Sequence, residues 1–115
     1  MNKVQQRWFE EGYCDERGAA FCANATRLPD GNFGIVCLCV KGNVLSIYDV
    51  DMRNNIKELL FNVNLNQIEG LKIRAGIFSQ KLYFVYNGGE FCFTNFIGVK
   101  PALKVLEEES AKNRI

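Results

Sequence analysis

The sequence contains no histidine, only two prolines and almost no excess of charge of either sign. Without histidine, the chain lacks the side chain that most often acts as a general base or activates a cysteine nucleophile. Fourteen basic residues stand against thirteen acidic ones, so no overall field would attract nucleic acid or an anionic membrane. These absences predict a protein that is not an enzyme, has no catalytic residues and binds no nucleic acid.

Long apolar runs are also missing. No stretch approaches the roughly 18 residues that a membrane helix needs, and Glu10 and Glu11 stand where a signal peptide would be apolar. We therefore expect an intracellular, cytoplasmic protein. The chain has 115 residues, of which 48% are hydrophobic and 23% are charged, and these values fit one globular domain with one core. We expect residues 1–115 to form that domain, with its core in roughly residues 20–112.

Seven segments rich in apolar residues, separated by turn residues, predict seven β-strands. They cover residues 19–28, 34–40, 44–50, 57–65, 68–76, 81–86 and 90–96. Gly42-Asn43 and the Asn-Gly-Gly segment at residues 87–89 are typical of tight hairpin turns, which require positive φ angles. Strands that follow one another so closely favour an antiparallel sandwich or barrel.

The two ends of the chain have a helical period instead. Residues 2–11 place Val4 and Trp8 four apart, which predicts a short helix that ends at Gly12. Residues 101–113, "PALKVLEEESAKN", predict a second amphipathic helix, which should pack its apolar stripe over the sheet. That stripe consists of Val99, Leu103 and Leu106.

The order of these elements resembles that of small bacterial pleckstrin-homology-like domains of the GRAM type. The resemblance rests on four segments, "CANATRL", "GIVCLCVKGNVLSIYD", "NQIEGLKIRAGIFSQKLYFVYNGGEFCFTNF" and "ALKVLEEE", and covers roughly residues 20–110. It implies a mainly β fold, a seven-stranded antiparallel barrel or sandwich capped by a C-terminal helix. It also implies a non-enzymatic domain that binds phosphoinositides, peptides or protein surfaces.

The phosphoinositide-binding members of that family carry several basic residues in and after the loop between the first two strands. Here the loop is "RLPDGNFG", where Asp30 opposes the single basic residue, Arg27. The loops expected at that end contribute Arg27, Arg53 and Lys57 against Asp30, Asp49 and Asp51. Because these charges balance, we predict that the domain does not bind membrane lipid and that its partner is a protein or peptide.

Cys37 and Cys39 are two residues apart on one strand, so their side chains should lie on the same face at a spacing of roughly 7 Å. At that spacing they could in principle share a soft metal. A zinc site needs two more ligands. The other cysteines, at irregular spacing, are Cys14, Cys22 and Cys92. We therefore predict no metal and no cofactor, with the cysteines acting as small apolar core residues.

Two groups of carboxylates have alternative interpretations. Asp49 and Asp51 could act as a catalytic pair, but aspartates at the end of a strand more often solvate the loop that follows, which is the interpretation we favour. The run Glu107–Glu109 predicts a solvated helix face, on which Glu108 should pair with Lys112 four residues later.

Lys72 and Arg74 share a strand face, with Lys81 expected nearby, and this patch is interpreted as the solvated face of a sheet. Ile77 and Phe78 form an apolar pair beside turn residues. They could contact a partner, but we predict instead that Phe78 folds back to fill one end of the barrel.

Two functional hypotheses remain. The first is a non-enzymatic interaction module that holds a protein or peptide through a sheet edge or through its open-end loops. The second is a small barrel that binds an apolar or anionic, lipid-like ligand, which requires an internal pocket of roughly 300 Å³ or more. The candidate contact residues are Arg27, Arg53, Lys57, Ile77 and Phe78.

Overall fold

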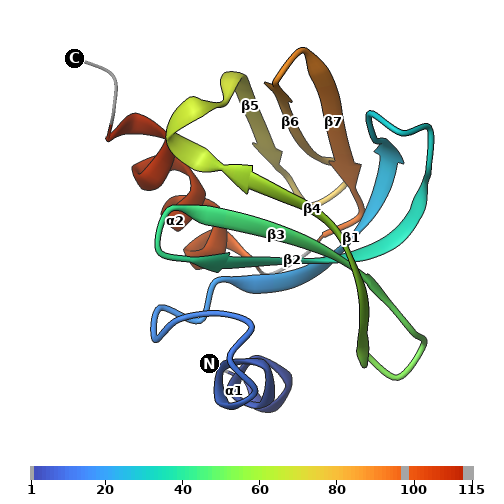
Figure 1. Ribbon diagram of the computed structural model, residues 1–115, viewed down its shortest axis with the longest axis vertical. Coiled ribbons are helices and arrows are strands. Elements are labelled where there is room, and N and C mark those ends of the chain that lie inside the picture. Colours follow the sequence, from blue (N-terminus) through green and yellow to red (C-terminus); the bar gives the residue numbers. More distant parts are fainter. Residues whose placement is uncertain (1, 97–98, 113–115) are drawn as a thin grey trace.

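The computed structural model describes residues 2–96 and 99–112, and Figure 1 shows the arrangement of its elements. The elements in chain order are α1 (Lys3–Glu10), β1 (Ala20–Arg27), β2 (Gly34–Lys41), β3 (Val44–Val50), β4 (Ile56–Asn64), the 3-10 turn η1 (Leu65–Gln67), β5 (Glu69–Ala75), β6 (Gln80–Tyr86), β7 (Gly89–Thr94) and α2 (Lys100–Ala111). Each predicted strand is present, with ends within two residues of those expected. The mainly β fold with a helix near each end is therefore confirmed.

The seven strands form one antiparallel sheet in the order β4-β3-β2-β1-β7-β6-β5. Local hairpins account for most of this order, and Gly42 and Asn87 adopt the positive φ angles, 63° and 51°, that their turns require. The long-range step pairs β1 with β7, for example Asn24 with Thr94. Strands β4 and β5 end the sheet on either side, so it is not closed into a barrel.

The sheet bends over a filled core. Phe61 of β4 and Phe91 of β7 are not on neighbouring strands, yet their ring centroids lie 5.2 Å apart. Phe91 also stacks on Phe84 of β6, with centroids 4.8 Å apart. The two halves of the sheet therefore face each other across a packed interior, as in a sandwich.

Helix α2 covers one end of this core, as Figure 1 shows. Leu103 and Leu106 are buried in the core and Val99 packs against it half-buried, which confirms the predicted stripe. The helix begins at Lys100, one residue before the predicted start, so that Pro101 stands in its first turn, where its missing N–H costs nothing. Residue 113, the last of the predicted helix, lies outside the described residues.

Helix α1 lies on the outside of the sheet, beside β1–β3 (Figure 1). Its N-cap Asn2 and Gln5 exchange hydrogen bonds of 2.8 and 3.0 Å, the reciprocal arrangement of a capping box. Trp8 is the buried residue of this helix, and its indole N–H donates to the Asn54 carbonyl at 3.2 Å. The predicted packing through tryptophan is confirmed, and Gly12 ends the segment at φ 85°.

Candidate binding surface

An apolar groove lies where the turn between β5 and β6 meets the start of α2. Its volume is about 360 Å³. The apolar side chains that line it include Ala75, Ile77, Phe96, Val99, Pro101 and Leu103. Ile77 and Pro101 are exposed, so the groove is a surface feature and not an internal cavity.

The turn beside this groove holds two apolar side chains in solvent. The Gly76 N–H donates to the Ser79 carbonyl at 3.0 Å, and the Gln80 side chain donates to the Gly76 carbonyl at 2.9 Å. Ile77 and Phe78 stand at the corner of this closed turn, 86% and 100% exposed. The prediction that Phe78 folds back was wrong, because the hydrogen bonds of the turn direct residues 77 and 78 outward.

A cationic patch lies on the outer face of β5 and β6, next to the turn. Lys72 and Lys81 place their ammonium groups 5.6 and 5.7 Å from the centroid of the Tyr83 ring. Arg74 lies opposite Lys81 in the register and donates to the Ser79 hydroxyl at 3.3 Å. The predicted neighbourhood of these three cations is confirmed. None of the ion pairs among residues 2–96 and 99–112 involves them.

Arg27, one of the predicted contact residues, pairs with Glu90 at 2.5 Å, and the hydrogen bond from that carboxylate raises the pKa of the guanidinium. The sequence indicated Asp30 as the residue opposing Arg27, but the partner of Arg27 in the structure is Glu90. Asp30 instead accepts a hydrogen bond from the Asn32 backbone at 3.0 Å. The sequence could not indicate Glu90, because the pairing of β1 with β7 brings it there from 63 residues away.

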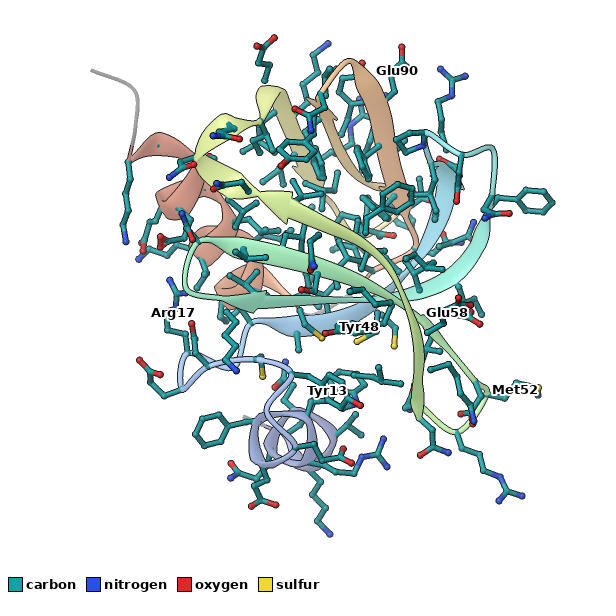
Figure 2. All side chains as sticks on the ribbon, viewed as in Figure 1. Tyr13, Arg17, Tyr48, Met52, Glu58 and Glu90 are labelled. Atoms are coloured by element: carbon teal, nitrogen blue, oxygen red, sulfur yellow. The ribbon has the colours of Figure 1, made fainter. Side chains whose placement is uncertain are left out.

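Arg53 and Lys57 lie in another region. Figure 2 shows Met52, in the loop of Arg53, at the lower right of the molecule, well below Glu90, the partner of Arg27, at the top. Lys57 pairs with Asp51 at 3.6 Å. The structure therefore does not bring the three predicted cations together into one anion site.

Asp51 organises the loop between β3 and β4. One carboxylate oxygen accepts the backbone N–H groups of Asn55 and Arg53 at 2.9 and 2.8 Å, and these hydrogen bonds lower the pKa of Asp51 to about 2. The interpretation as a loop-solvating carboxylate is thus confirmed for Asp51, while Asp49 is exposed on β3.

Glu109 departs from the predicted solvated face of α2. Its side chain is only 4% exposed and accepts hydrogen bonds from Lys112 at 2.8 Å and from Arg17 at 3.2 Å. The ion pair of Lys112 is therefore with Glu109, three residues away, and not with Glu108. Because Arg17 reaches α2 from the segment before β1, the sequence alone gives no sign of this burial.

Cys37 and Cys39 lie beneath α1, in a small cluster with Trp8 and Cys14 that is separate from the main core. Their sulfur atoms are 3.6 Å apart, closer than the predicted spacing of the side chains. Burial raises the pKa of Cys14 to about 11. Within the described part of the chain, no group of three or more histidine, cysteine or acidic side chains is arranged to hold a metal ion.

The sequence did not predict the groove. Its lining comes from residues 75–80 and 96–103, and only the fold brings these segments together.

Among the described residues, neither helix has the length and apolar character that crossing a membrane requires. Comparison with models of known protein families and with curated proteins finds no match to the chain.

Proposed function

We propose that this protein is a non-enzymatic interaction module with a pleckstrin-homology-like architecture, which holds an extended peptide of a protein partner. The peptide would lie along the free edge of β5 and place an apolar side chain in the groove beside α2. The observation that carries this proposal is the exposed pair Ile77 and Phe78 on a hydrogen-bonded turn at the rim of that groove. The strand order and the helix over one end of the core support the architecture.

The turn is suited to binding because its apolar side chains are already in place. Covering a fully exposed phenylalanine yields about 1.5 to 3 kcal/mol of hydrophobic free energy. Phe78 is 100% exposed, and hydrogen bonds from Gln80 and across the turn hold the backbone at its position. Binding of a partner would therefore cost little conformational entropy in this turn.

The edge of β5 supplies the second part of the site. Among the strands that the structure describes, β5 pairs only with β6, so its other edge presents backbone N–H and C=O groups that an added strand can bind. The cationic patch of Lys72, Arg74 and Lys81 lies along the same strand pair. Lys100 adds a fourth cation at the groove. The partner chemistry that fits is an extended peptide with an apolar anchor and acidic neighbours.

A random peptide library displayed on phage and selected on the immobilised protein tests this proposal. We expect selection of sequences that combine an apolar residue with acidic ones. Synthetic copies of those peptides should bind at least about tenfold more weakly to Phe78→Ala, a loss of about 1.4 kcal/mol. Arg74→Glu should also weaken peptide binding, because it reverses a charge on the edge strand β5.

Met52→Ala is the matched control. Met52 is also 100% exposed, but it lies in the β3–β4 loop and does not line the groove. Its substitution should leave peptide affinity unchanged. Selected peptides that bind equally well to the wild type and to Phe78→Ala, or that lose affinity only in Met52→Ala, would contradict the proposed site.

The groove volume favours a second candidate, a small apolar ligand, because 360 Å³ lies within the usual range of ligand pockets. A medium-chain fatty acid is a suitable probe. Such a ligand would need the groove wall at Leu103 but not the exposed ring of Phe78. Saturable binding of the fatty acid that persists in Phe78→Ala would favour this candidate over the peptide.

A further inference from the structure

Three thiols meet on the outer face of β1 and β2, beneath α1. Cys37 Sγ lies 3.6 Å from Cys39 Sγ, and Cys22 lies directly opposite Cys37 in the register of the two strands. Figure 2 shows sulfur atoms gathered between the sheet and α1, near Tyr13 and Tyr48. All three cysteines are free thiols.

The register makes Cys22 and Cys37 a non-hydrogen-bonded pair. Val40 N donates to Ala19 O at 2.9 Å, so these two opposed residues form a hydrogen-bonded pair. Hydrogen-bonded and non-hydrogen-bonded pairs alternate along an antiparallel ladder. Cys22 and Cys37 are three steps along the ladder from Ala19 and Val40, so they form a non-hydrogen-bonded pair. In such pairs the Cα atoms approach to about 4.5 Å, within the range of about 4.4 to 6.8 Å that a disulfide requires.

The alternative bond between Cys37 and Cys39 fits less well. Residues two apart on one strand have Cα atoms separated by about 6.6 Å, at the upper limit for a disulfide, and their side chains run side by side. The sulfur atoms are close, but the extended backbone of β2 keeps the two Cα atoms apart. The cross-strand pair is therefore the one that can be bridged without moving the backbone.

The two cysteines of the cross-strand pair differ in access. Cys22 is half-buried and lines a cavity of about 240 Å³ between α1 and β1, whereas Cys37 is 0% exposed. A hydrogen bond from the Cys37 thiol lowers the pKa of Cys22, and the same contact, with burial, raises the pKa of Cys37. A small oxidant would therefore reach Cys22 first, with a thiol partner directly behind it.

We propose that Cys22 and Cys37 are a peroxide-sensitive pair that forms a reversible cross-strand disulfide. The Cys22 thiolate attacks hydrogen peroxide, the O–O bond breaks, and Cys22 becomes a sulfenic acid as hydroxide leaves. The Cys37 sulfur then attacks the Cys22 sulfur and the S–O bond breaks. The thiol proton and the sulfenic oxygen leave as water. Two thiols and one peroxide thus give one disulfide and two waters, and a dithiol reductant reverses the change.

The disulfide would act on the contact between α1 and the sheet. Cys22 Sγ lies 3.6 Å from Asn54 Oδ1 and donates to it, a hydrogen bond that the disulfide removes. The carbonyl of the same Asn54 accepts hydrogen bonds from Arg7 and Trp8 of α1. Because Trp8 is the only tryptophan and packs in the cluster with Cys37, its fluorescence reports the reaction.

The test treats the reduced full-length protein with equimolar hydrogen peroxide, traps the free thiols with iodoacetamide and maps the peptides by mass spectrometry. We expect the Cys22 and Cys37 thiols to be lost together, with a linked peptide between them, and dithiothreitol to restore both. The fluorescence of Trp8 should change at the same rate. Cys92, half-buried on β7, is an internal control that should remain free.

Two variants complete the experiment. Cys92→Ser should form the disulfide as the wild type does, and Cys22→Ser should leave Cys37 reduced and the Trp8 emission unchanged. A Cys37–Cys39 link, or loss of the Cys92 thiol as fast as that of Cys22, would overturn the proposal. This comparison is made in the wild type, so it holds even if the circular dichroism of Cys22→Ser shows that the variant does not fold.

Discussion

At the scale of single residues, Arg17 joins three parts of the chain. Its guanidinium pairs with Asp15 at 2.7 Å and with Glu109 of α2 at 3.2 Å, and it donates to the Gly42 carbonyl at 2.7 Å. Asp15 in turn accepts the Gly42 N–H at 2.8 Å. The segment before β1, the β2–β3 turn and the last helix are thus connected through one cation.

This network predicts a loss of stability in acid. The hydrogen bond from Arg17 lowers the pKa of Asp15 to about 2, below its ordinary value of about 3.9. A carboxyl whose pKa is lower in the folded state stabilises the fold above its ordinary pKa, and the contribution is lost as the pH falls from about 4 towards 2. We expect Asp15→Asn to reduce the free energy of unfolding at pH 7 by about 1 to 2 kcal/mol.

Urea denaturation of both proteins from pH 7 to pH 2 measures this contribution. The difference in unfolding free energy between wild type and Asp15→Asn should be constant down to about pH 4. It should then narrow towards pH 2, because the Asp15 carboxyl becomes protonated in the unfolded state before it does so in the folded state. A difference that stays the same down to pH 2 would show that Asp15 does not act through its charge.

The same scale shows where sequence reasoning stops. The role of Asp51 in its loop was predictable, because its partners Arg53 and Asn55 are within four residues. The burial of Glu109 was not, because its partner Arg17 is 92 residues away. Phe78 was misassigned because an apolar residue beside a turn fits both a core and a partner contact until the backbone of the turn is known.

At the scale of elements, the fold was largely predictable, since the signals of a β-hairpin are local. Alternating apolar residues defined the strands, and Gly42-Asn43 defined a turn. The pairing of β1 with β7 could not be predicted from such local signals, because nothing in either strand specifies a partner more than 60 residues distant. The groove between the β5–β6 turn and α2 depends on this kind of long-range arrangement.

The docking of α2 can be tested at this scale. Leu103 is 4% exposed and belongs to the main core, so Leu103→Ala should lower the free energy of unfolding by about 2 to 5 kcal/mol. Lys104→Ala, at the exposed neighbouring position, should change it by less than about 0.5 kcal/mol. Chemical denaturation compares the three proteins, and a Leu103→Ala effect no larger than that of Lys104→Ala would mean that the helix does not pack on the core.

At the scale of the whole molecule, the cations are dispersed instead of converging. Arg27 is paired with Glu90 and Lys57 with Asp51. Arg53 makes no ion pair in the part of the chain that the structure describes, but it stands alone beside Met52. Among the described residues, Lys72, Arg74 and Lys81 form a patch of cations without ion pairs, which the sequence identified only as a solvated face.

This distribution predicts weak attraction to anionic membranes. Each basic residue near such a surface contributes about 1 kcal/mol, so the three cations of the patch and Lys100 at the groove supply about 4 kcal/mol. That corresponds to a complex of only millimolar affinity. We therefore expect negligible sedimentation of the protein with phosphatidylcholine vesicles that contain phosphatidylserine or a phosphoinositide at physiological salt.

Three variants would identify the surface responsible if sedimentation were observed. Micromolar binding that disappears in Arg27→Ala and Arg53→Ala would place lipid recognition at the predicted open-end loops, despite the ion pair of Arg27 with Glu90. Binding that disappears in Phe78→Ala would instead assign the exposed turn to membrane insertion, since a fully exposed aromatic ring can enter a bilayer interface as well as a peptide groove. The peptide proposal requires that neither occurs, because its binding energy comes from the edge of β5 and from a groove that a flat lipid surface cannot fill.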